Sequence, residues 1–432
     1  MADLAVYTVG CKVNQAESEE LKMGLIEAGH GVCRDPAAAD LCVVNTCTVT
    51  AESDRKCRKL IRWLGRKGAK AIVVAGCYAE VNPGDLKDLP GVVKLLPNTH
   101  KDEWLQEISS MLPATKTLPV PPVRFRSRGF IKVQDGCERE CSYCIVPRAR
   151  GKERSRPPME VVSEVRRWLE KEVGELVLSG INLGRYNRGG GYDLASLVRD
   201  VLSSGSRFRV RLSSIELEDL KKEWIDEWSV SNRICPHLHL PLQSGDEAIL
   251  RDMGRGYRPE DFLEAVREIR SSWPRAALTT EVIVGYPGES EEAFQRTVDL
   301  LQEVRPARIH VFRFSPRAGT RAGEKKVTAC PQETENRSAL LREMAEGWRM
   351  RYIEERMGET REFLVERLVE RNVGRAALGT TEDYIKGILH EPTVAAEPGR
   401  ILEVSISGLE GGMASLENKA LGFEPSRIDV DV

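Results

Sequence analysis

The sequence predicts an α/β protein of three parts: a small N-terminal domain with a parallel sheet, a central partial (βα)6 barrel and a small C-terminal β-barrel. Strand-like and helix-like runs alternate through residues 1–112 and again, on a larger scale, through residues 129–357. A Pro-rich segment without periodicity, residues 113–128, is the expected linker between them. In residues 358–432, glycines punctuate short strands instead, which is typical of a small β-barrel.

The N-terminal part predicts parallel strands with helices between them, because short apolar runs alternate with longer stretches of helical character. The expected strands are Ala5–Val9, Leu41–Thr46, Ala71–Ala75 and Val92–Leu96. The expected helices are Gln15–Ala28, Glu52–Arg66 and His100–Met111. In open parallel sheets, ligand sites form outside the carboxyl ends of the strands.

Three cysteines stand at those carboxyl ends. Cys11 follows the first strand, Cys47 follows the second and Cys77 follows the third. Because the ends of parallel strands meet at one edge of the sheet, we expect the three thiols to converge on a site that can hold a metal group. A purely structural role for these thiols stays open at this point.

The central part predicts about six βα units. The expected strands are Gly129–Gln134, Glu175–Ile181, Phe208–Ser214, His237–Leu242, Leu278–Val284 and Arg308–Phe314. The expected helices are Pro158–Lys171, Leu194–Leu202, Asp246–Met253, Pro259–Ser271, Glu291–Val304 and a long charged helix, Gln332–Met357. The C-terminal strands are expected at Glu362–Glu366, Ala376–Thr380, Tyr384–Leu389 and Ile401–Ile406.

A second group of cysteines forms a C-x3-C-x2-C run of Cys137, Cys141 and Cys144 directly after the first strand of the expected barrel. Three thiolates on a four-iron, four-sulfur cluster leave one iron open to a small molecule. A structural zinc site needs a fourth protein ligand, whereas the closest His is His100 and the next Cys is Cys235. The run therefore favours reactive iron over zinc.

Composition limits the location of the protein and its partners. The net charge of −2 does not by itself indicate a nucleic-acid binder, and no apolar run approaches the length of a membrane span. No signal peptide is apparent, and eleven cysteines without one suggest reduced thiols in the cytoplasm. Basic residues cluster locally, with eight Lys or Arg within residues 55–70, where a solvated helix face is an alternative to phosphate binding.

The chain resembles the radical S-adenosylmethionine enzymes, because their signature is a C-x3-C-x2-C run with an aromatic residue, here Tyr143, before the last cysteine. The cysteines of the N-terminal part and the terminal barrel, which looks like the RNA-binding TRAM type, make it similar to the methylthiotransferases over essentially its whole length. The segments Gly10–Gln15, Asn45–Thr50 and Phe314–Thr320 resemble the threonylcarbamoyladenosine branch of that family. The chain departs from the branch pattern at Ala16, Glu281 and Phe314.

The resemblance implies roles for particular residues. Cys137, Cys141 and Cys144 would ligate the radical cluster, and Cys11, Cys47 and Cys77 an auxiliary four-iron, four-sulfur cluster that carries sulfur. Residues expected to contact S-adenosylmethionine are Tyr143, Gly180, Asn182, Ser214, Glu216, Gln243, Ser244, Val284 and Gly285. Phosphate contacts are expected from Arg148, Arg150, Arg154 and Arg156. Arg317 is the candidate for a substrate carboxylate, with an ordinary salt bridge as the alternative.

The implied reaction inserts a methylthio group at C2 of N6-threonylcarbamoyladenosine, next to the anticodon at position 37 of tRNA. It uses two molecules of S-adenosylmethionine per turnover, one to methylate the sulfur and one to generate a radical. A tRNA anticodon loop, an electron donor protein and a sulfur source are the expected partners, and no membrane is expected. Two alternatives stay open. In the first, the protein performs the same chemistry on a ribosomal protein; in the second, it is a zinc-dependent RNA-binding protein without catalysis.

Overall fold

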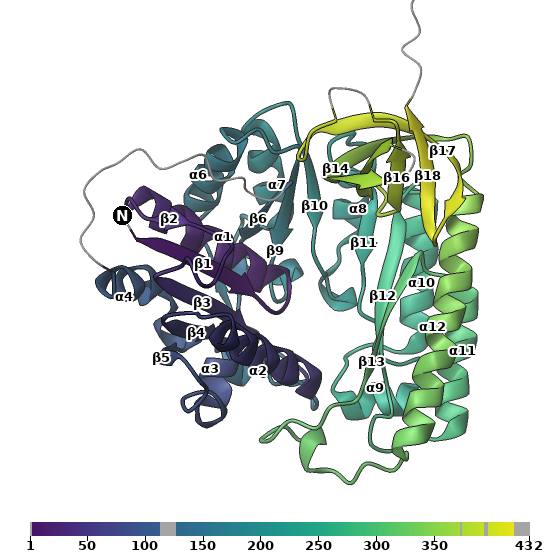
Figure 1. Cartoon of the computed structure of the whole chain (residues 1–432). Coiled ribbons are helices and arrows are strands. Elements are labelled where there is room, and N and C mark those ends of the chain that lie inside the picture. Colours follow the sequence, from purple (N-terminus) through teal and green to yellow (C-terminus); the bar gives the residue numbers. More distant parts are fainter. Residues whose placement is uncertain (1, 113–126, 372–373, 393–395, 419–432) are drawn as a thin grey trace, which may run out of the picture.

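The computed structural model describes residues 2–112, 127–371, 374–392 and 396–418. Residues 113–126 of the expected linker therefore lie outside the described residues. Figure 1 shows the N-terminal domain against one side of the central barrel, and the C-terminal strands at the end where the barrel strands begin. No helix of the described ranges is long and apolar enough to cross a membrane.

The N-terminal domain is a five-stranded parallel sheet in the order β2-β1-β3-β4-β5. Its strands are β1 (Asp3–Thr8), β2 (Gly31–Val32), β3 (Leu41–Thr46), β4 (Ile72–Gly76) and β5 (Val92–Leu96). Its helices are α1 (Lys12–Glu27), α2 (Ala51–Arg66), α3 (Cys77–Val81) and α4 (Trp104–Ser110). All six residues of β3 are buried because helices cover both faces of the sheet, which explains its uninterrupted apolar run.

The central part is an open six-stranded barrel made of two parallel sheets, β10-β9-β6 and β11-β12-β13. Two parallel bridges connect the sheets, one from Val210 to Ile234 and one from Ser214 to His239. Its main strands are β6 (Arg128–Lys132), β9 (Glu175–Ser179), β10 (Arg209–Leu212), β11 (His237–His239), β12 (Ala277–Val284) and β13 (Arg308–Arg313). Its helices are α5 (Val146–Arg150), α6 (Pro158–Leu169), α7 (Leu194–Ser203), α8 (Lys222–Ser229), α9 (Glu247–Met253), α10 (Pro259–Ser272), α11 (Glu291–Val304) and α12 (Pro331–Glu354). A short antiparallel pair, β7 (Gln134–Asp135) and β8 (Arg154–Ser155), flanks the cysteine loop.

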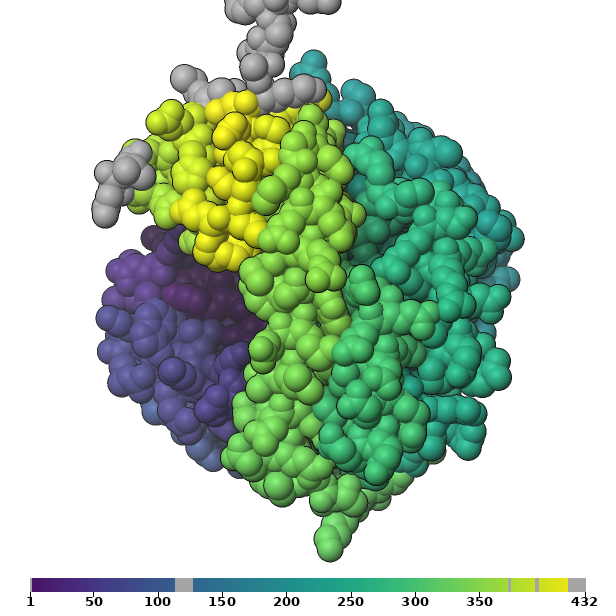
Figure 2. All heavy atoms as spheres, turned by 90° about the vertical axis from the view of Figure 1, so that its right-hand side faces the viewer, coloured from purple at the N-terminus to yellow at the C-terminus, as the bar shows by residue number. Residues whose placement is uncertain are grey.

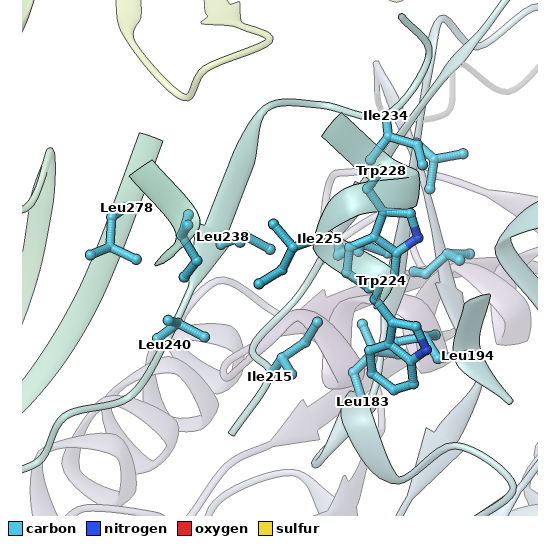
Figure 3. Packing of buried hydrophobic residues seen from close by; sticks show 14 of the residues in the cluster. Leu183, Leu194, Ile215, Trp224, Ile225, Trp228, Ile234, Leu238, Leu240 and Leu278 are labelled. Carbon is cyan, nitrogen blue, oxygen red and sulfur yellow. The ribbon is translucent and has the colours of Figure 1, made fainter. Parts of the chain in front are cut away.

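The outer faces of the barrel strands bury their alternate apolar residues under the helices. In Figure 3, Trp224 and Trp228 of α8 lie among leucine and isoleucine side chains of neighbouring elements. The two indoles are one helical turn apart, and their ring centroids are 5.6 Å apart. This packing fixes the strands and, with them, the loops at their carboxyl ends.

Helix α1 of the N-terminal domain lies on the inner face of the open barrel. Its Ala16 is 1% exposed and packs on Phe130 of β6 and Val177 of β9, whereas the alternate residue Ile131 faces α6 on the outside. The small alanine allows a helix to approach the strands closely. The N-terminal domain thus covers the open side of the barrel with one of its own helices.

The C-terminal strands close into a barrel in the order β14-β15-β16-β18-β17. They are β14 (Thr360–Arg371), β15 (Gly374–Thr381), β16 (Lys386–His390), β17 (Ile401–Glu410) and β18 (Met413–Asn418). Helix α12 leads into this barrel and packs on β13 and β17, and Figure 2 shows it running along the outside of the molecule. The helix ends at Glu354, three residues before the predicted Met357.

Buried charges attach the C-terminal barrel to the amino ends of the central strands. Arg209 and Arg211 of β10 both bond the carboxylate of Glu175, with N–O distances of 2.8–2.9 Å. Arg209 also donates to the carbonyl oxygen of Thr380 at 3.2 Å, and Arg211 donates to that of Thr381 at 3.0 Å. A buried ion cluster therefore closes one end of the barrel.

Candidate active site

The structure brings Cys11, Cys47 and Cys77 together at the carboxyl edge of the N-terminal sheet. Strands β1, β3 and β4 are adjacent and parallel, and each of the three cysteines follows one of them. A Cβ atom built on Gly10 would lie 2.9 Å from Cβ of Cys47, so the ends of β1 and β3 are in contact. Burial, followed by the nearby Cys11 and Cys77 thiols, raises the pKa of Cys47 to about 12.

Two asparagines hold this edge in place. Asn14 Nδ2 donates to Asn45 Oδ1 at 2.9 Å and to the carbonyl oxygen of Thr46 at 3.1 Å, and Cys11 Sγ lies 3.1 Å from Asn14 Oδ1. Asn98 Nδ2 lies 3.3 Å from Sγ of Cys77 and donates to the carbonyl oxygen of Ala149 in α5 at 2.7 Å. Asn98 therefore joins this cysteine site to the barrel. Sequence reasoning missed both asparagines, although Asn14 belongs to the same short motif as Cys11.

A buried charge cluster lies beside the same site. It consists of Glu17, Asp135, Arg150, Lys101 and Lys132. Arg150 Nη1 lies 2.9 Å from Glu17 Oε1 and 2.8 Å from Asp135 Oδ1, while Lys101 Nζ lies 2.6 Å from a carboxylate oxygen of each. The positive charge of Arg150 lowers the pKa of Cys11, against the larger effect of burial, which raises it. Three cations face two carboxylates here, so the cluster carries an excess positive charge beside Cys11.

The second cysteine group lies in the loop between β7 and α5, at the carboxyl end of the first barrel strand. Gly136 has φ +72°, and a Cβ there would meet the carbonyl oxygen of Lys152 at 1.9 Å, so only glycine fits this turn. The Cys137 N–H donates to the Gly151 carbonyl oxygen at 3.1 Å, and that of Cys144 donates to the Cys141 carbonyl oxygen at 3.0 Å. The loop is therefore pinned at both ends, and its three cysteines are partly exposed.

Positive groups lie around these thiols as well. The backbone N–H of Arg139 points to Cys137 Sγ at 3.4 Å, and Arg255 Nη1 lies 3.8 Å from Cys141 Sγ. Burial raises the pKa of Cys144 to about 12 and also raises that of Cys137. Ionising a buried thiol costs free energy, and a metal cluster that binds the thiolate offsets this cost by replacing the proton.

The donor sets fit iron–sulfur clusters. Within the described ranges, no three His, Cys, Asp or Glu side chains converge on a point where a single ion could sit. A cubane does not require such convergence, because each thiolate binds a different iron atom. Three soft thiolates in each site, with N–H groups directed at several of the sulfur atoms, match the ligands and hydrogen bonds of such clusters.

The residues expected to contact S-adenosylmethionine gather at the carboxyl ends of the barrel strands. Gly180 and Asn182 follow β9, Ser214 and Glu216 follow β10, Gln243 and Ser244 follow β11, Val284 ends β12 and Gly285 follows it, while Tyr143 lies in the cysteine loop. Among the described side chains, Asn182 Oδ1 and Gln243 Oε1 are buried without a hydrogen-bond partner. Buried acceptors without partners at the strand ends are groups that a polar ligand would satisfy.

Other residues of this group already have partners within the protein. The Gly285 N–H donates to Glu289 Oε2 at 2.7 Å, and Ser244 Oγ lies 3.4 Å from Thr297 Oγ1 of α11. Glu216 pairs with Arg255, whose guanidinium also approaches Cys141. The backbone of Gly285 is therefore not free to bond adenine in this arrangement, and Glu216 would reach a ribose only if it shared its carboxylate with Arg255.

The arginines expected to bind RNA do not form one group. Arg148 and Arg154 are exposed, but Arg150 is buried in the charge cluster, and Arg156 pairs with Glu164. Arg150 differs from the expectation because its side chain points inward, to carboxylates on α1 and β7. Arg317 is also buried: its Nη2 lies 2.8 Å from Asp54 Oδ2 and 2.6 Å from Thr48 Oγ1. The structure thus gives Arg317 an ordinary salt bridge, which is the alternative to binding a substrate carboxylate.

Comparison with known proteins agrees with this geometry. Residues 131–301 match the radical SAM superfamily, and residues 3–97 match the uncharacterized protein family UPF0004. The fold resembles that of the radical S-adenosylmethionine methyltransferase TsrM from Kitasatospora setae, with a TM-score of 0.54 and 16% identity over 75% of this chain and 74% of that one. Fold and site thus define a radical S-adenosylmethionine enzyme.

The relatives narrow this class. The chain is 35% identical to the threonylcarbamoyladenosine tRNA methylthiotransferase MtaB of Thermotoga maritima, over 99% of this chain and 100% of the relative. It is 36% identical to MtaB of Aquifex aeolicus, over 84% and 92% of the two chains. A tRNA-2-methylthio-N(6)-dimethylallyladenosine synthase of Pelobacter propionicus is 32% identical over 88% and 92%. The chain belongs to the threonylcarbamoyladenosine tRNA methylthiotransferase family, MtaB.

Proposed function

We propose that this protein inserts a methylthio group at C2 of N6-threonylcarbamoyladenosine beside the tRNA anticodon. The names of relatives such as the Thermotoga maritima and Aquifex aeolicus proteins support the choice of substrate. The observation that carries the proposal is the pair of three-cysteine sites, one from each domain, on the two sides of one interface. Asn98 and Arg150 cross that interface and approach Cys77 from opposite parts of the chain.

Each three-cysteine site would hold one four-iron, four-sulfur cluster with an open iron. Cys137, Cys141 and Cys144 would hold the radical cluster, and Cys11, Cys47 and Cys77 the auxiliary one. When bound, these clusters and two molecules of S-adenosylmethionine supply the radical and the methylated sulfur. The protein orients the cofactor with the free acceptors of Asn182 and Gln243 and excludes water by covering the open barrel with α1.

The RNA would approach from the side where Arg148 and Arg154 are exposed. The C-terminal barrel would act as an RNA-binding module of the TRAM type, and the base beside the anticodon can leave a single-stranded loop without melting a duplex. An electron donor protein and a sulfur source complete the reaction, in the cytoplasm. We divide the chain accordingly into residues 1–112, 113–128, 129–357 and 358–432.

The test is turnover on defined RNA. Reconstituted enzyme, S-adenosylmethionine, sulfide and a reductant are incubated with anticodon stem-loops that carry either threonylcarbamoyladenosine or isopentenyladenosine. Mass spectrometry of the nucleosides should show the methylthio product from the first substrate. Product from the isopentenyl substrate alone, or from neither, would contradict the proposal.

A matched control uses a buried thiol outside both three-cysteine sites. Cys11→Ala and Cys137→Ala should each abolish product, because each removes a ligand of a different cluster. Cys42→Ala should keep turnover, because Cys42 lies in the middle of β3, within the core of the N-terminal sheet.

A further inference from the structure

The inner face of the barrel carries a polar group that none of the roles above uses. It consists of His239 on β11, Glu281 on β12 and His310 on β13, named here the lumen triad. His239 Nε2 lies 3.7 Å from Glu281 Oε2, the His239 and His310 ring centroids are 5.8 Å apart, and Glu281 is paired with His310 in the strand register. The Glu281 side chain is 28% exposed, so the group is open to ligands. Barrel interiors are usually filled by apolar branched side chains, and polar groups in such a place indicate a binding site.

Lys12 of the N-terminal domain faces the same space. It lies one helical turn from Ala16 on α1, and Ala16 packs on the inner face of β6 and β9. Burial, followed by nearby charges that include those of Arg308 and Lys12, lowers the pKa of His310 to about 4, so the ammonium group lies near the lumen triad. The side chain is partly exposed.

Lys12 has no counter-ion among the residues that the structure describes. In the described part of the chain, no carboxylate lies within ion-pair distance of its ammonium group. Glu175, whose charge reaches Lys12, is already bonded to Arg209 and Arg211.

We propose that Lys12 and the lumen triad bind the N6 substituent of the target adenosine, with Lys12 pairing its carboxylate. The inference rests on the proposed function. A threonylcarbamoyl group carries one carboxylate and one hydroxyl, which are the partners that a free ammonium, a carboxylate and two imidazoles can bond.

The covalent structure of adenine supports this placement. C2 and N6 are separated along the ring by only N1 and C6, so a base that presents C2 to the Cys11 site places its N6 substituent beside that site. Lys12 directly follows Cys11 in the chain. A further candidate cation, Arg317, is occupied by Asp54 and Thr48.

The experiment compares two ligands on the full-length, reconstituted enzyme. One anticodon stem-loop carries threonylcarbamoyladenosine, and the other carries its methyl ester, which lacks the negative charge. Binding is measured by fluorescence anisotropy without S-adenosylmethionine, and turnover is measured separately. Native enzyme should bind the acid at least about tenfold more tightly than the ester, as expected for a charge-assisted bond.

Variants locate the charge. Lys12→Gln should bind acid and ester alike, and Lys12→Arg should keep most of the preference. If native enzyme binds both ligands equally, or if Lys12→Gln retains the native preference, the inference is overturned. The native-enzyme comparison decides the question even if Lys12→Gln fails to fold. Because binding tests Lys12 and turnover tests the reaction, failure of the proposed function is seen separately, as absence of product from the acid.

Discussion

Arg150 carries a positive charge into the interface between the two cysteine sites. Its guanidinium bonds Glu17 on α1 and Asp135 on β7, and its charge acts on Cys11 and Cys77. The sequence places Arg150 in an alternating run with Arg148, Arg154 and Arg156, which suggests a surface that binds phosphate. That pattern cannot show that Glu17, 133 positions before Arg150, faces only Arg150 among the four arginines. The identity of a charged residue is visible in the sequence, whereas its partner is a property of the folded chain.

Removing this charge tests its structural role. Arg150→Gln should lower the free energy of unfolding by about 3–5 kcal/mol, because it leaves a buried carboxylate pair with less compensation. Arg150→Lys should lose less, since it keeps the charge but not the forked geometry. Thermal and denaturant unfolding measure both. A stability of Arg150→Gln equal to that of the native protein would refute the assignment.

At the scale of elements, most strands and helices of the two α/β parts follow from the sequence because buried parallel strands read as apolar runs, but α3, α5 and α8 are not among the expected helices. Strand β2 is not predicted because it has only two residues, and β18 is not predicted because Met413–Asn418 mixes small and polar residues. The candidate cysteines follow from their positions after strands. The lumen triad could not be recognised in advance, since its members lie on three strands whose inner faces only the folded barrel defines.

Helix α8 offers a test of the barrel packing. Trp228 is fully buried among leucine and isoleucine side chains, whereas Val230, just beyond the helix, is 86% exposed. Trp228→Ala should cost about 3–5 kcal/mol of unfolding free energy through the cavity that it leaves. Val230→Ala is the matched control and should stay within about 0.5 kcal/mol of the native value. Similar losses for both variants would show that α8 does not pack on the barrel as described.

At the scale of the molecule, the two cysteine sites exist as one active site only because the N-terminal domain docks on the barrel. Asn98 bonds α5, α1 lies on the inner face of β6 and β9, and Asp54 pairs with Arg317 beyond β13. The domain therefore contacts both edges of the open barrel. The family resemblance implies docking, because both clusters must face one substrate, but it does not reveal these contacts.

The Asp54–Arg317 pair can be tested as an interdomain contact by a double-mutant cycle. Asp54→Ala and Arg317→Ala should each destabilise the protein, and the double variant should lose less than the sum, with a coupling energy of about 0.5–3 kcal/mol. Arg317→Ala should also keep the preference for the acid over the ester substrate. Strict additivity, or loss of that preference, would return Arg317 to the role of a substrate ligand.

The most direct test of two cluster sites in one chamber is the iron content of three reconstituted proteins. Native protein should hold about eight irons per chain, because each cubane has four. The triple variant Cys11→Ala/Cys47→Ala/Cys77→Ala and the triple variant Cys137→Ala/Cys141→Ala/Cys144→Ala should each hold about four. Native protein that binds no more than about four irons, or a triple variant that keeps the native content, would contradict the account.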